Sequence, residues 1–126
     1  MSEQDYNVQV SAEAVFVPER SDPDAERFFF AYTITIRNQG SVAARLLTRH
    51  WIITDGTGSE QEVHGDGVVG EQPHMEPGQG FQYTSAAVIE TPVGSMHGSY
   101  QMVADDGVEF EAPIAPFRLA VPSSLH

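Results

Sequence analysis

The sequence predicts an all-β protein, a fibronectin-III- or immunoglobulin-like antiparallel β-sandwich of about seven strands. Three observations indicate this class. Apolar and polar residues alternate with period 2 in several runs, and no window of helical length carries an apolar stripe at helical spacing. Turn-forming residues also recur roughly every 8–12 positions, the spacing of short strands in sandwiches and barrels.

The clearest predicted strand is 28–37, where five apolar side chains fall on one face and Thr33, Thr35 and Arg37 on the other. Short turns join neighbouring runs, which favours antiparallel pairing. The absence of cysteine removes the Cys–Trp–Cys pattern of immunoglobulin domains, so a fibronectin-III-like sandwich fits better. The predicted strands are 7–17, 28–37, 44–54, 60–64, 80–89, 96–104 and 108–113.

The length of 126 residues predicts a single domain covering 1–126, with an ordered core of about 6–119 between a polar N-terminus and a C-terminal tail expected to fray at 122–124. No linker, repeat or low-complexity tract divides the chain. The acidic start carries no signal-peptide pattern and no apolar run reaches membrane-spanning length, so we expect a cytoplasmic protein that does not enter a membrane.

The formal net charge of −12 comes from eighteen acids against six arginines, with no lysine. A surface this acidic repels phosphate backbones, which argues against nucleic-acid binding. Cysteine and lysine chemistry are unavailable, and no nucleophile lies in a recognisable arrangement with a base. We therefore expect a binding module that is not an enzyme and needs no cofactor, with another protein as its partner.

Arg37, Arg45 and Arg49 place half of the positive charge in two predicted strands. By strict alternation, residues 45, 47, 49, 51 and 53 share one face of the third strand. If that face meets solvent, Arg45, Arg49 and Trp51 form a surface of the kind enriched at protein interfaces, with Arg37 nearby. The alternative is that Trp51 belongs to the core and the arginines pair with the abundant acids.

Gly65, Gly67 and Gly70 match the G-x-G-x-x-G pattern of dinucleotide-phosphate sites. That chemistry needs a following helix whose N-terminus faces the pyrophosphate, and no helix fits before the strand at 80–89. The Asp66 charge would also repel phosphate. A glycine-rich bend that lets backbones approach closely is the preferred interpretation, and a small phosphate ligand held by backbone N–H groups is the alternative.

His64 and His74 flank the glycine segment, with Asp66 between them. Imidazole and carboxylate groups are ligands for divalent transition metals, provided that three or four of them converge. A divalent-cation site at His64, His74 and Asp66 is therefore a second alternative. Histidines scattered over the surface account for the same pattern without a metal.

Several short runs occur together: RHW at 49–51, VHGDGVVG at 63–70, QP at 72–73, PG at 77–78, FQYTS at 81–85, TPVGSMHGSY at 91–100 and PF at 116–117. In order and spacing they resemble the ApaG family over nearly the whole chain, from about Val8 to Leu119. The resemblance implies a fibronectin-III-like fold and a bacterial protein associated with cobalt resistance and magnesium efflux. It also implies a protein-interaction module, like related domains in eukaryotic F-box and polymerase-delta-interacting proteins, and it supplies no catalytic residues.

Overall fold

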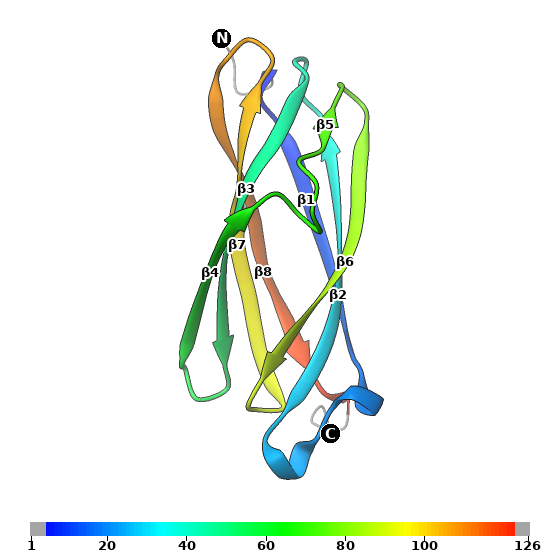
Figure 1. The fold of residues 1–126 in the computed structure, drawn as a ribbon, viewed down its shortest axis with the longest axis vertical. Coiled ribbons are helices and arrows are strands. Elements are labelled where there is room, and N and C mark those ends of the chain that lie inside the picture. Colours follow the sequence, from blue (N-terminus) through cyan, green and yellow to red (C-terminus); the bar gives the residue numbers. More distant parts are fainter. Residues whose placement is uncertain (1–4, 123–126) are drawn as a thin grey trace.

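The computed structural model describes residues 5–122 and folds them into two antiparallel sheets packed face to face (Figure 1). The strands are β1 Val8–Phe16, β2 Phe28–Asn38, β3 Ala44–Asp55, β4 Glu60–Asp66, β5 His74–Met75, β6 Gly80–Ile89, β7 Val93–Ala104 and β8 Glu109–Ala120. The smaller sheet has the order β1-β2-β6. The larger has the order β4-β3-β7-β8, and β5 also pairs with β3. The expected antiparallel sandwich is therefore confirmed.

Two single-turn 3₁₀ helices, η2 Pro18–Arg20 and η3 Pro23–Ala25, connect β1 to β2. Within residues 5–122, no helical segment has the length and apolar character that a membrane crossing requires. Most of the expected polar N-terminus, and all but one residue of the tail segment expected to fray, lie outside the described residues.

Apart from shifts of one or two residues at strand ends, the observed strands differ from the predicted ones in three places. β7 begins at Val93, three residues before the predicted start, where a turn was expected. The two-residue strand β5, which pairs with Ala44 and Arg45, is too short to show alternation in the sequence. The last strand was predicted to end at Pro113, but β8 continues to Ala120. It can do so because β8 is an edge strand and pairs on one side only, with β7. A proline lacks the backbone N–H, and this loss costs no hydrogen bond at a position whose N–H would point away from β7.

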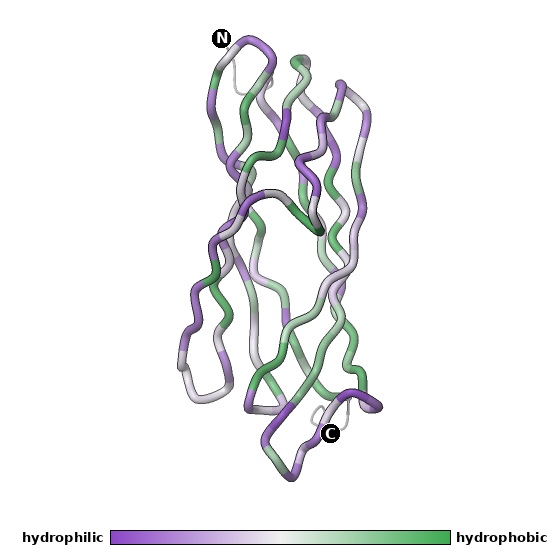
Figure 2. Tube along the Cα trace, viewed as in Figure 1, coloured by the Kyte–Doolittle hydropathy of each residue, from purple (hydrophilic) through white to green (hydrophobic). Residues whose placement is uncertain are grey.

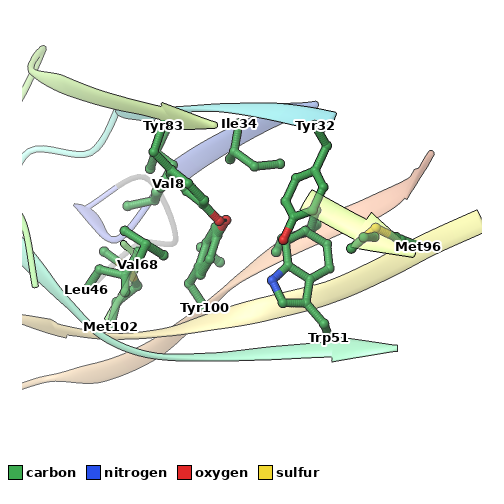
Figure 3. Packing of buried hydrophobic residues seen from close by; sticks show 14 of the residues in the cluster. Val8, Tyr32, Ile34, Leu46, Trp51, Val68, Tyr83, Met96, Tyr100 and Met102 are labelled. Atoms are coloured by element: carbon green, nitrogen blue, oxygen red, sulfur yellow. Dashed lines mark hydrogen bonds between the residues drawn. The ribbon is translucent and has the colours of Figure 1, made fainter. Parts of the chain in front are cut away.

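The core lies between the two sheets and follows the alternation of the sequence. In β2, the inward side chains of Phe30, Tyr32, Ile34 and Ile36 are buried while the residues between them are less so. Figure 2 shows the corresponding change between apolar and polar residues along the strands. Side chains of β3, β7 and β8 meet these residues from the larger sheet (Figure 3). Their burial removes apolar surface from water, which is the main force holding the layers together.

The centre of this core contains one polar contact between the sheets. The hydroxyls of Tyr83 on β6 and Tyr100 on β7 lie 2.5 Å apart, each the hydrogen-bond partner of the other (Figure 3). Burial raises the pKa of Tyr83 to about 12, and burial likewise raises the pKa of Tyr100. Both phenols therefore stay neutral at physiological pH, and the pair fixes the position of β6 over β7.

The costs of removing the two hydroxyls of this pair should not be additive. Tyr83→Phe leaves the buried Tyr100 hydroxyl without a partner, which should lower the free energy of unfolding by about 1–3 kcal/mol. Tyr83→Phe combined with Tyr100→Phe leaves no unsatisfied group, so its cost should be smaller than the sum of the two single costs. Urea unfolding of the three variants and the unchanged chain measures this coupling, and strictly additive costs would contradict it.

Candidate functional site

Strand β3 contains a β-bulge that decides which of its side chains face the core. Residues 46 and 48 pair with consecutive residues of β7, so Leu47 is an extra residue on β3. Before the bulge, Leu46 is buried; after it, the inward positions are those of Arg49 and Trp51. The extra residue thus moves the inward face by one position, and strict alternation fails here.

The bulge is held by the glycine segment, residues 65–70, which overlaps the end of β4, and by Gln72 just after it. The carbonyl of Leu47 accepts a hydrogen bond from the backbone N–H of Gly67 at 2.8 Å and another from the side-chain amide of Gln72 at 2.9 Å. A bulged residue leaves the regular pattern of hydrogen bonds between strands, so its polar groups need such partners. The glycine segment therefore has a structural task at this position.

The bulge places Trp51 in the core, where its side chain is only 2% exposed. Its ring makes edge-on contacts with Tyr32, Tyr100 and Phe117 at centroid distances of 5.5, 6.3 and 5.9 Å. The alternative in which residues 45, 47, 49, 51 and 53 form one solvent-facing surface is therefore wrong. Trp51 is not accessible to a partner.

The three predicted arginines separate in space. Arg37 and Arg45 are exposed, and they donate to the backbone carbonyls of Gly78 at 3.2 Å and Gln72 at 2.7 Å. Arg49 is half-buried on the inward side of β3. Every ion-pair contact within residues 5–122 joins a histidine to an acid. No arginine there has a carboxylate oxygen within 4.0 Å of its guanidinium. The expected pairing of these arginines with acids is therefore not observed.

Arg49 is held by the glycine segment through backbone contacts. Its guanidinium donates from one nitrogen to the carbonyls of Asp66 at 2.9 Å and Gly67 at 3.0 Å. It lies flat against Gly65, where a Cβ atom would be 2.6 Å from the guanidinium carbon. At Gly67 a Cβ atom would be 2.2 Å from the carbonyl oxygen of Glu71. Gly67 is thus required by close approach to the backbone, as the preferred interpretation of the motif expected, while a side chain at Gly65 would displace the Arg49 guanidinium.

The motif ends in a tight turn at residues 68–71. Val68 and Glu71 exchange two backbone hydrogen bonds of 2.8 and 2.9 Å, and the two residues between them, Val69 and Gly70, have φ angles of +43° and +82°. This is the pattern of a type I′ turn. The N–H groups of Gly67, Val68 and Glu71 all donate to backbone carbonyls, and no helix follows in the described residues. Phosphate binding by these amides stays a prediction, with few free donors to support it.

A pocket of about 320 Å³ opens between the turn and the smaller sheet. Its lining consists of Tyr32, Arg49, Asp66, Val68, Val69, Gly70, Tyr83 and Ser85. Arg49 brings a positive charge into this pocket, and no carboxylate oxygen of residues 5–122 lies within 4.0 Å of it, although Asp66 also lines the pocket and the protein carries a large negative net charge. A half-buried guanidinium with carbonyl partners only favours an anionic group as its neighbour.

The pocket adjoins a free strand edge. β6 pairs with β2 along its whole length, and the backbone groups of residues 80–89 that face the other way bond to no other segment of residues 5–122. Tyr83 and Ser85 belong both to this strand and to the pocket lining. The pocket and the free edge therefore form one continuous site, and we call the two together the β6 site.

The predicted metal ligands do not converge. They were His64, His74 and Asp66. His74 lies 2.9 Å from the carboxylate of Asp105, whereas His64 lies beside Glu62 and stacks on the ring of His50. The His50–His64 contact joins residues that are far apart in the sequence, so only the pairing register of β3 and β4 reveals it.

The turn at residues 68–71 yields a prediction about stability. Valine is β-branched, and a positive φ strains it, while asparagine tolerates this conformation and is common at this position of type I′ turns. We expect Val69→Asn to raise the free energy of unfolding by about 1 kcal/mol. The matched control Val69→Thr keeps a β-branched side chain and should change little. A Val69→Asn variant that unfolds at the same or lower urea concentration would show that the valine is not strained.

Comparisons with known proteins agree with this architecture. A family model described as the ApaG domain matches residues 18–104. Protein ApaG from Azoarcus sp. is 60% identical over 121 residues, covering 96% of this chain and 95% of the relative. Protein ApaG from Methylococcus capsulatus is 58% identical over 126 residues, the full length of both. The crystal structure of a putative ApaA protein from Bordetella pertussis has a TM-score of 0.90 at 50% identity, over 92% of this chain and 94% of that chain. The chain belongs to the ApaG family.

Proposed function

We propose that this protein is a non-catalytic binding module that takes up an extended, acid-bearing segment of another protein as an additional strand on β6. One observation carries the proposal: β6 is a ten-residue edge strand without the features that normally prevent such pairing. An unguarded edge is a template for another strand. The expected association with cobalt resistance and magnesium efflux stays a prediction.

The other edges of the two sheets are guarded. β4 carries Glu60, Glu62 and Asp66, and β8 carries two prolines and pairs irregularly with β7. β1 lies beside β8, where the margins of the two sheets meet (Figure 1). β6 has no charged residue, no proline and no irregularity in its pairing with β2. Charges, prolines and bulges are the devices by which natural sheets block their edges, so β6 is the exception.

The free hydrogen-bonding groups of β6 can be assigned from the register. Asn38 donates its N–H toward the β6 side of β2, to the carbonyl of Gln79. In an antiparallel pair the direction of the N–H groups alternates from residue to residue. The N–H groups that face the open edge are therefore those of the even-numbered residues, Gly80, Gln82, Thr84, Ala86 and Val88. These are the donors that an added strand would use.

The pocket gives this edge a chemical preference. Side chains of an added strand would lie beside Tyr83 and Ser85 and point into the space between the sheets, because cross-strand neighbours share a face. Arg49 lies in that space, where none of the carboxylates in residues 5–122 forms an ion pair with it. A glutamate or aspartate of the incoming segment would supply the missing anion in a charge-assisted hydrogen bond.

A synthetic peptide tests the proposal directly. The probe is an acetylated octapeptide of alternating threonine and valine with one central glutamate, and its control has glutamine at the same position. We expect amide signals of residues 82, 84, 86 and 88 to shift in NMR titrations and their hydrogen exchange to slow, more strongly with the glutamate peptide. An unchanged β6 at millimolar concentrations of both peptides would refute the proposal.

A variant separates strand addition from contact by side chains alone. Ala86→Pro removes one edge-facing N–H without breaking a bond to β2, whereas Ala86→Val keeps that donor on the same exposed position. Peptide binding should be lost in the first variant and kept in the second, with thermal melting confirming that both are folded. Equal binding by the two folded variants would contradict pairing through the backbone.

A further inference from the structure

The outer face of the larger sheet brings two histidines and a glutamate together. His50 on β3 and His64 on β4 are directly paired across the two strands, and Glu62 lies two residues before His64, hence on the same face. Trp51 and Val63, the neighbours in sequence, point into the core instead. The β3 bulge that buries Trp51 is therefore also what turns His50 outward, opposite His64.

The three side chains converge on one point. The Nε2 atoms of His50 and His64 lie 2.6 and 3.3 Å from the same oxygen of Glu62. The two imidazole rings are stacked, with centroids 4.1 Å apart and planes inclined by 8°. One ligand atom from each residue falls within 4.8 Å of the other two, and this is the one such group of His, Cys, Asp or Glu found in residues 5–122.

This geometry matches the ligand set of a transition-metal ion. Zinc takes imidazole nitrogen and carboxylate oxygen at about 2.0–2.2 Å in a tetrahedral arrangement, which separates its ligand atoms by roughly 3.4 Å. The 3.3 Å distance from His64 to Glu62 is close to that separation, whereas the 2.6 Å contact of His50 with Glu62 must lengthen by side-chain rotation to admit the ion.

We propose that His50, Glu62 and His64 form a zinc site on the outer face of the larger sheet. The three residues supply three ligands, and the remaining position faces solvent, where water or a donor from another molecule completes the coordination. His64 and Glu62 are exposed, so the ion enters without any movement of the backbone. The site is separate from the β6 site and does not depend on peptide binding.

Calorimetric titration of the full chain with zinc chloride tests this site. We expect one saturable site per chain, with affinity lower by more than about 100-fold in His64→Gln and in Glu62→Gln, since the loss of even an outer-shell partner costs 10–100-fold. His74→Gln is the matched control, because His74 also contacts a carboxylate but lies outside this cluster. It should bind zinc like the unchanged chain.

Proton NMR supplies a second readout in the unchanged chain. The ring signals of His50 and His64 should move together on zinc addition while those of His74 and His97 stay in place. Two results would overturn the proposal: no saturable binding at millimolar zinc, or an equal loss of affinity in His74→Gln and His64→Gln. Melting curves of the metal-free variants verify that each is folded.

Discussion

The extra residue in β3 is the feature on which the rest of the structure depends. Because Leu47 is accommodated as a bulge, Arg49 and Trp51 turn inward and His50 turns outward. The freed carbonyl of Leu47 is bonded by Gly67, which anchors the glycine segment across the opening between the sheets. This single irregularity therefore has three consequences. It sets the packing of Trp51, the position of Arg49 beneath the glycine segment and the pairing of the two histidines.

Several energetically unfavourable features lie close to the β3 bulge and the glycine segment. Val69 has a positive φ at the tip of the turn and is 55% exposed, and Arg49 forms no ion pair with any acid among residues 5–122. The buried indole nitrogen of Trp51 also lacks a hydrogen-bond partner in the described part of the chain. Each of these features costs stability, and such costs concentrate where a protein's function requires them. Their proximity to an unguarded edge supports a binding role for the β6 site.

Local alternation was enough to predict most of the fold. Residues 28–36 and 80–89 show the period of a strand buried on one face. Their pairing with each other could not be predicted, since the short turns that follow them lead to β3 and β7 of the other sheet. Alternation failed in β3 because Leu47 adds one residue that the sequence does not mark, so the predicted surface of Arg45, Arg49 and Trp51 divides between solvent and core. The reason for Gly65 was equally hidden, since the guanidinium that lies against it comes from another strand. The cluster at His50 required the register of β3 against β4.

The fluorescence of Trp51, the one tryptophan in the chain, tests the inward turn of β3 most directly. A tryptophan enclosed by Tyr32, Tyr100 and Phe117 should emit at short wavelength and resist quenching by acrylamide until the protein unfolds in urea. Emission at the wavelength of the unfolded chain, with full quenching under native conditions, would mean that residues 49 and 51 face solvent. The bulge, the inward position of the half-buried Arg49 and the β6 site would then all be contradicted.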